Sequence, residues 1–220
     1  MSDTDSFIEE VTEEVKRDKL FAIFRKYGWI AVLGVIVLVG GASYNEYAKS
    51  KARVAAEAAG DAISAALAVE DAQARADALG ALDLAGQPRI LSDMIRAGEL
   101  HAVGNADGAV AALAPYVADA TLAPVYRDLA VLKTAMLGAA NIDAQARIAM
   151  LASIASPGAP YRLLAEEQIA VAQIEAGQLD AAIEGLRAIA EDGEASQALR
   201  RRAVQMIVAL GGDLTAATDG

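Results

Sequence analysis

Two stretches of the chain, "AGELHAVGNADGAVAALAPYVAD" at residues 97–119 and "AVAQIEAGQLDAAIEGLRAIAED" at residues 170–192, align with each other without a gap. Each predicts a helix, a turn and a second helix, because the shared glycine favours the left-handed backbone that ends a helix. A small alanine on the second helix lets the paired helices approach closely. Asp107 and Asp180, three residues after the glycines, are predicted to cap the second helices. The matched repeat positions are Gly104 with Gly177, Ala109 with Ala182, and Leu113 with Leu186.

A third glycine, Gly138, indicates a period for these stretches. It lies 34 residues after Gly104 and 39 residues before Gly177. A period of about 34 residues is that of the tetratricopeptide repeat, a helical hairpin whose apolar face is buried by the next hairpin. The five additional residues are expected near "SPGAP" at residues 156–160. A plain helical bundle is the alternative, and the two gapless stretches favour the repeat.

The rest of the chain after residue 48 departs further from this pattern. Residues 50–84 predict an atypical first hairpin whose second helix ends near Gly86 and Pro88. Residues 122–154 predict a degenerate middle unit, and residues 195–212 predict a closing helix. Alanine, the best helix former, accounts for 53 of the 220 residues, and aromatic residues make up 5%. The expected fold class is therefore all-α, a tetratricopeptide-repeat-like α-solenoid of helical hairpins.

Ahead of the repeats lies the apolar stretch "YGWIAVLGVIVLVGGASYNEY" at residues 27–47, in which 19 consecutive residues carry no charge. About 20 helical residues span the hydrocarbon layer of a membrane, and aromatic residues gather at its two interfaces. The stretch therefore predicts a single N-terminal transmembrane helix. A cleaved signal peptide, cut after Ala42, and a buried core helix are the alternatives. The aromatic ends of the predicted anchor are Tyr27, Trp29, Tyr44 and Tyr47.

Basic residues near the span predict its orientation. Five precede it, with Arg25 and Lys26 directly beside it, and three follow it closely, which favours a cytoplasmic N-terminus. The expected organisation is a cytoplasmic leader at 1–26, the transmembrane helix at 27–47, an extracytoplasmic repeat domain at 48–212 and a flexible tail at 213–220. The leader is either an ordinary tail or an amphipathic helix, whose apolar face would hold Phe7, Val11 and Val15.

The layout resembles the YfgM family of ancillary subunits of the bacterial SecYEG translocon. The resemblance rests on the leader "FIEEVTEEVKRDKLFAIFRKYG", the span "WIAVLGVIVLVGG", the following "YNEYAKSKARVAAEAAGDAISAAL" and the repeat "AGQLDAAIEGL". It implies a bacterial inner-membrane protein with a periplasmic repeat domain, which associates with the translocon and a membrane-anchored periplasmic chaperone and has no enzyme activity. Glu166 and Gln173 stand where the repeat usually has large aromatic residues, so no binding residues are transferred from the family.

The residues themselves contain little that indicates chemistry. The chain has one histidine, His101, no cysteine, and none of the common phosphate-binding, zinc-protease or nucleophile motifs. Its net charge of −11 argues against nucleic acid as a partner. The expected function is that of a non-enzymatic, membrane-anchored interaction protein without cofactor or metal, and the resemblance implies that it is an ancillary subunit linking the Sec translocon to periplasmic chaperones. The alternative is an accessory or assembly subunit of another inner-membrane complex, respiratory or envelope.

Overall fold

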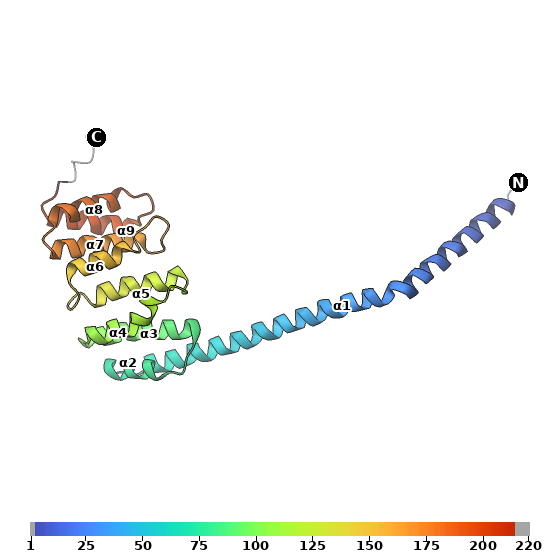
Figure 1. The fold of residues 1–220 in the computed structure, drawn as a ribbon, viewed down its shortest axis with the longest axis horizontal. Coiled ribbons are helices and arrows are strands. Elements are labelled where there is room, and N and C mark those ends of the chain that lie inside the picture. Colours follow the sequence, from blue (N-terminus) through green and yellow to red (C-terminus); the bar gives the residue numbers. More distant parts are fainter. Residues whose placement is uncertain (1–2, 214–220) are drawn as a thin grey trace. The chain divides into compact units, whose positions relative to one another are not determined.

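The computed structural model describes the backbone of residues 3–213, and the side chains of residues 25–27, 29–30 and 33–213 (Figure 1). Every regular element in that range is an α-helix, so the predicted all-α class is confirmed. The chain divides into two units, Met1–Ala58 and Ala59–Gly220, which are described separately below.

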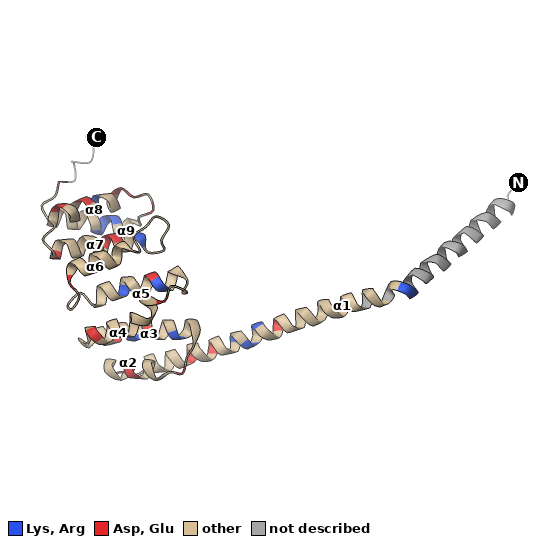
Figure 2. Ribbon diagram, in the orientation of Figure 1, with Lys and Arg blue, Asp and Glu red and all other residues tan. Residues whose placement is uncertain are grey.

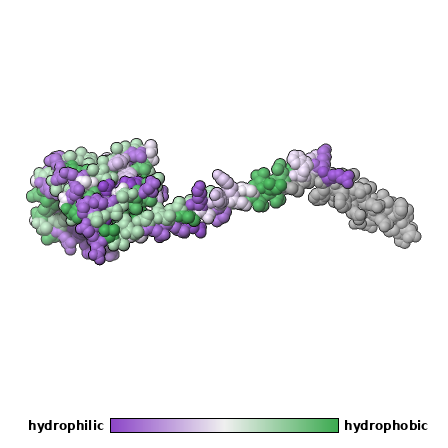
Figure 3. Space-filling view, turned by 90° about the horizontal axis from the view of Figure 1, so that it is seen from below, coloured by the Kyte–Doolittle hydropathy of each residue, from purple (hydrophilic) through white to green (hydrophobic). Residues whose placement is uncertain are grey.

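The first unit consists of most of helix α1 (Asp3–Leu67), in which every described side chain of residues 25–58 is exposed. Figure 3 shows a band of hydrophobic residues along this helix. Among the described residues, no helical segment is both long and apolar enough to cross a membrane. Gly28, Ala31 and Val32 of the predicted span lie outside the described side chains, as do Phe7, Val11 and Val15 of the leader.

The second unit is a series of helices in which each packs against the next along the chain (Figure 1). The last turns of α1 contact α2 through a cluster that contains Ile63, Ala66 and Leu79. The predicted series of sequential helical hairpins is therefore confirmed. The helices are α2 (Ala72–Ala81), α3 (Gly86–Ala102), α4 (Ala106–Ala118), α5 (Pro124–Leu137), α6 (Ala144–Ala152), α7 (Arg162–Glu175), α8 (Leu179–Glu191) and α9 (Gln197–Ala209).

Three further apolar clusters follow the one at α1 and α2 along the unit, and neighbouring clusters share a helix. Helix α5 contributes Ala130 to the cluster with α2, α3 and α4, and Val131 to the cluster with α6 and α7. Helix α7 contributes Ala165 to that second cluster and Ala170 to the cluster with α8 and α9. Each hairpin therefore buries an apolar face against the following hairpin, as stacked helical repeats do.

The hairpins also stack through their first helices. Helix α3 contacts α5, and α5 contacts α7, in addition to the contacts of each helix with its own hairpin partner. In such an array the first helices line one face and the second helices the other. This arrangement is consistent with the tetratricopeptide-like repeat expected from the sequence.

The turn glycines Gly104 and Gly177 have φ angles of 79° and 74°, in the left-handed region that glycine adopts without strain. The predicted capping by aspartate is wrong. Asn105 is the N-cap of α4 and accepts a hydrogen bond from the amide of Gly108, whereas Gln178 occupies the N-cap of α8 without a side-chain bond. Each helix begins one residue after its cap, so the two aspartates lie in the first turn. Their negative charges there interact favourably with the helix dipole. These aspartates are Asp107 and Asp180.

Gly138 serves a different purpose from the other turn glycines, because its φ is −89°. A Cβ at Gly138 would lie 2.8 Å from the carbonyl oxygen of Thr134 and 2.9 Å from Val110 Cγ2, so the position requires space rather than a left-handed backbone. The prediction that Gly86 and Pro88 mark the end of a helix is also wrong. They lie in the first turn of α3, where a proline loses no intrahelical hydrogen bond.

The additional residues of the middle unit lie largely where the sequence placed them. The connection from α6 to α7 runs from residue 153 to residue 161, whereas α4 and α5 are joined by residues 119–123. Gly158, within "SPGAP", has a φ of 82° and turns the backbone there. The predicted tail beyond Asp213 lies outside the described residues.

Candidate interaction groove

A groove with a volume of about 570 Å³ lies across helices α5, α7 and α9. All three are first helices of successive units, so the groove belongs to the face on which the first helices stack. The lining residues are Leu132 and Met136 from α5, Leu164, Glu167, Gln168 and Val171 from α7, and Arg202, Gln205, Met206 and Ala209 from α9.

The walls of the groove are mainly apolar, and part of that apolar surface is open to solvent. Leu164 is 40% exposed and Met136 is 46% exposed, although both are large hydrophobic side chains. Two of the five methionines in the chain, Met136 and Met206, line the groove. Methionine is flexible and polarisable, so such walls adapt to apolar groups of different shapes.

Exposed aliphatic residues recur along the array beyond the groove. Leu91, Val125 and Leu164 lie on α3, α5 and α7, and each is at least 40% exposed. They are separated by 34 and 39 residues, which are the spacings of the three turn glycines Gly104, Gly138 and Gly177. The three aliphatic side chains therefore occupy one equivalent position on successive first helices and form a row on the same face.

An ion pair forms part of the lining of the groove. Arg202 Nε and Nη2 donate to the two carboxylate oxygens of Glu167, at 2.7 and 2.8 Å. The Glu167 side chain is 8% exposed and that of Arg202 is 49% exposed, so the carboxylate is covered while the guanidinium reaches solvent. The carboxylate raises the pKa of Arg202 above its usual value, so its positive charge is permanent.

Three polar groups of the lining have no protein partner among the described residues. Arg202 Nη1 is not used in the bond to Glu167, and the side-chain amides of Gln168 and Gln205 form no hydrogen bond to the protein. A polar ligand in the groove could therefore accept a hydrogen bond from the guanidinium, and could donate to or accept from either of the two side-chain amides.

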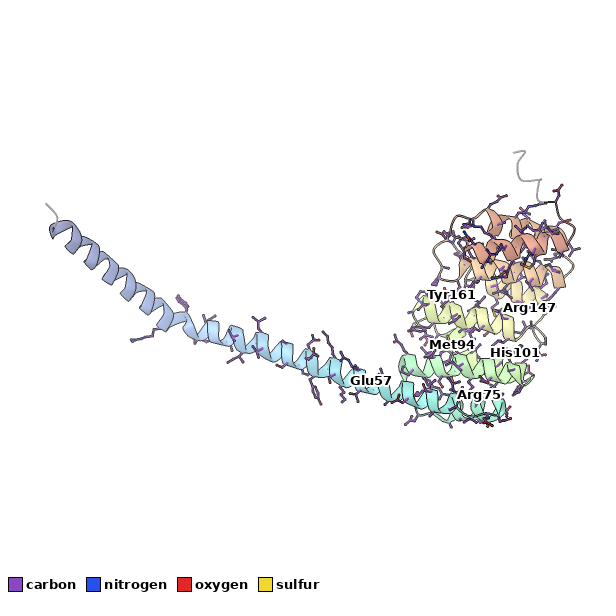
Figure 4. The ribbon with its side chains drawn as sticks, turned by 180° about the vertical axis from the view of Figure 1, so that it is seen from behind. Glu57, Arg75, Met94, His101, Arg147 and Tyr161 are labelled. Carbon is purple, nitrogen blue, oxygen red and sulfur yellow. The ribbon has the colours of Figure 1, made fainter. Side chains whose placement is uncertain are left out.

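Charged residues occur on most helices of the unit (Figure 2), and several of them form ion pairs between elements. Arg162 at the start of α7 donates to Asp192 and to Glu194, each at 2.8 Å, and so lowers the pKa of Asp192. Arg75 on α2 donates to Glu99 on α3 at 2.7 Å, and Arg147 on α6 is paired with Glu175 on α7. Figure 4 labels Arg75 and Arg147 on their helices.

The residues chosen from the sequence lie away from the groove. Ala109, Leu113, Ala182 and Leu186 are fully buried between helices, and Gly104 and Gly177 are in turns. The anchor residues Tyr27, Trp29, Tyr44 and Tyr47, and the flanking Arg25 and Lys26, are exposed on α1. The groove residues were missed, although the 34-residue spacing of Leu91 and Val125 was a signal that could have indicated this face.

His101 is exposed near the end of α3 (Figure 4), and no group of three or more potential ligands for a metal ion occurs in the described region. Comparison with protein-family models, with curated proteins and with solved structures returns no match to this chain.

Proposed function

We propose that this chain is a non-enzymatic interaction protein, tethered to the bacterial inner membrane by α1, whose repeat unit binds other proteins through the groove across α5, α7 and α9. The observation that carries this proposal is the groove itself. Its apolar side chains are partly exposed, and its lining comes from the first helices of successive units. A concave, mainly apolar site with a few polar groups is the usual form of a binding site.

The tether is supported by the exposed apolar side chains of α1. Every described large hydrophobic residue from Ile30 to Val39 is at least 48% exposed. Such a contiguous apolar surface is unfavourable in water and is stabilised in lipid or against a partner. Arg25 and Lys26 at one end favour a cytoplasmic N-terminus, which places the repeat unit in the periplasm.

The proposed partners come from the resemblance of the sequence to the YfgM family. They are a SecYEG-type translocon and a periplasmic chaperone. A tether raises the local concentration of the repeat unit near membrane complexes, so weak contacts through the groove suffice for binding.

In vivo photo-crosslinking tests this function. A crosslinking amino acid is introduced at Leu164 in the groove and, as a control, at Leu179 on α8, which is similarly exposed at 44%. We expect crosslinks from Leu164 to a translocon subunit or a chaperone, identified by mass spectrometry. Crosslinks to a respiratory or envelope complex instead would overturn the Sec assignment in favour of that complex.

Topology is tested separately. Alkaline phosphatase fused after Asp219 is active only when it is exported. We expect an active fusion protein that remains in the membrane fraction after alkaline extraction. An inactive fusion would reverse the orientation, and an active fusion released into the soluble fraction would indicate cleavage near Ala42.

A further inference from the structure

We propose that the groove across α5, α7 and α9 binds extended, apolar segments of unfolded polypeptide, and that Gln168, Gln205 and Arg202 recognise the backbone of the bound segment. This inference rests on the proposed interaction function and specifies the kind of partner that the groove accepts.

The dimensions of the groove fit a short extended segment. Its lining on α7 runs from Leu164 to Val171, which is about 10 Å of helix at about 1.5 Å per residue. Three helices spaced about 9 Å apart give a width of about 18 Å. An extended chain at about 3.3 Å per residue crosses that width with about six residues, of which about three point to the same side.

The volume agrees with this estimate. The groove measures about 570 Å³. An apolar cavity of about 150 Å³ holds one benzene molecule, so this groove has room for about three or four apolar side chains. Leu132, Val171 and Met206 supply walls from all three helices.

The polar groups of the groove complement a backbone that has free amide and carbonyl groups. Arg202 Nη1, Gln168 and Gln205 have no protein partner in the described part of the chain. A helical ligand already satisfies its own amides and carbonyls, whereas an extended ligand presents both to its surroundings. Glutamine side chains can meet both, since each amide donates and accepts.

The charges select the same kind of ligand. Arg202 is paired with Glu167 through Nε and Nη2, so the unbonded polar group of this ion pair is the Nη1 donor, which attracts carbonyl oxygens. Residues 59–213 contain 20 Asp and Glu against 11 Lys and Arg, a net charge of −9. This negative field favours segments that are flanked by lysine or arginine rather than by acidic residues. The occupant is therefore apolar at its centre and basic at its ends.

Peptide binding to the full chain in lipid nanodiscs tests the inference. Two fluorescein-labelled peptides of about sixteen residues share one composition apart from the crosslink described next, rich in leucine with lysine at both ends. One has leucine at alternate positions, and the other has leucine at helical spacing and a side-chain crosslink that locks the helix. Fluorescence anisotropy, corrected with empty nanodiscs, gives the two dissociation constants. We expect the alternating peptide to bind at least about tenfold more tightly. Equal or tighter binding of the locked helix would overturn the proposal.

Variants then locate the site. We expect Leu164→Glu to weaken binding of the alternating peptide by about tenfold or more, and the control Leu179→Glu to leave it unchanged. Methylation of the backbone amides of the peptide, and the double variant Gln168→Ala with Gln205→Ala, should each weaken binding. Unchanged binding of the methylated peptide would contradict backbone recognition. If peptide binding fails while photo-crosslinks from Leu164 persist, this inference is wrong and the proposed function stands.

Discussion

Arg202 and Glu167 join the first helices of two successive units, because the guanidinium on α9 spans both carboxylate oxygens of the residue on α7. The bidentate geometry fixes the two helices relative to one another in the lining of the groove. The pair thus contributes to the shape of the groove as well as to its charge, and one of its guanidinium nitrogens remains available to a ligand.

Removal of Arg202 should therefore lower the free energy of unfolding. In Arg202→Ala, the buried carboxylate of Glu167 loses both donors. Breaking a buried pair from one side costs about 3–5 kcal/mol, and the half-exposed arginine reduces this to about 2 kcal/mol because water can reach the site. Urea unfolding of the full chain in detergent, followed by circular dichroism, measures the loss.

The matched control is the double variant Glu167→Leu with Arg202→Leu, which leaves no buried charge. We expect it to recover most of the lost stability, since apolar replacements of buried pairs are often neutral. A double variant that is less stable than Arg202→Ala would show that the pair itself, rather than the unpaired carboxylate, carries the free energy.

Gly138 should be the least replaceable of the turn glycines on steric grounds. In Gly138→Ala the new methyl group meets the carbonyl oxygen of Thr134 and the side chain of Val110. Overpacking of this kind costs about 1–3 kcal/mol in the free energy of unfolding. The control is Gly185→Ala in α8, where a Cβ meets nothing within 4 Å, so the better helix propensity of alanine should stabilise the chain by about 0.5–1 kcal/mol.

The alanines of the repeat positions should be equally sensitive to size. Ala182 on α8 is fully buried, so Ala182→Leu forces the paired helices apart and should cost about 1–3 kcal/mol in unfolding free energy. Its neighbour Ala181 on the same helix is exposed, and Ala181→Leu should change the stability by less than about 0.5 kcal/mol. Similar losses from both variants would contradict the close helix approach.

The sequence predicted the hairpins because their signals are local. A turn that requires a left-handed backbone selects glycine, and a close helix contact selects alanine. The two residues therefore recur at a fixed spacing, as Gly104 and Ala109 do. The precise cap was less predictable, since Asn105, Asp107 and other polar residues near a helix start can all accept from free amides, and the choice depends on where the first turn closes.

The groove could not be predicted in the same way. Its lining comes from three helices that are distant in sequence, and its polar groups are ordinary residues such as Gln168 and Gln205. Whether these polar side chains can reach a ligand depends on which side of each helix the neighbouring hairpins leave uncovered. That side is set by the stacking of the whole array. The pairing of Arg202 with Glu167 likewise joins residues 35 positions apart and follows no local pattern.

The hydrogen bonds of Asp192 should make stability depend on acid pH. Arg162 and the amide of Glu194 both donate to this carboxylate, and they lower its pKa, with the Arg162 bond as the largest cause. A lowered folded pKa contributes stability above the usual carboxyl pKa of about 4, and the contribution is lost as the pH falls through the folded value. Asp192→Asn should therefore be less stable than the native chain at pH 7, and the difference should shrink below about pH 4. The control is Asp83→Asn, at an exposed residue in the connection after α2, and its unfolding free energy at pH 7 should stay close to that of the native chain.

Tyr116 on α4 should produce the opposite dependence at alkaline pH. Its hydroxyl donates to Asp93 Oδ2 on α3 at 2.5 Å, and burial, followed by this bond to Asp93, raises its pKa to about 12. A raised folded pKa contributes stability below the unfolded value of about 10, and the contribution is lost as the pH rises toward the folded value. Tyr116→Phe should cost about 1 kcal/mol at neutral pH, because Asp93 loses a donor in a buried position.

This difference in unfolding free energy between Tyr116→Phe and the native chain should stay constant up to about pH 10 and decline between about pH 10 and 12. Tyr126→Phe is the matched control, since the hydroxyl of Tyr126 has no protein partner among the described residues. Absorbance of the tyrosinate band during alkaline titration gives a second measurement, in which Tyr116→Phe should remove a step near pH 12. If that step persists in Tyr116→Phe, another tyrosine carries the raised pKa and the bond to Asp93 is not its cause.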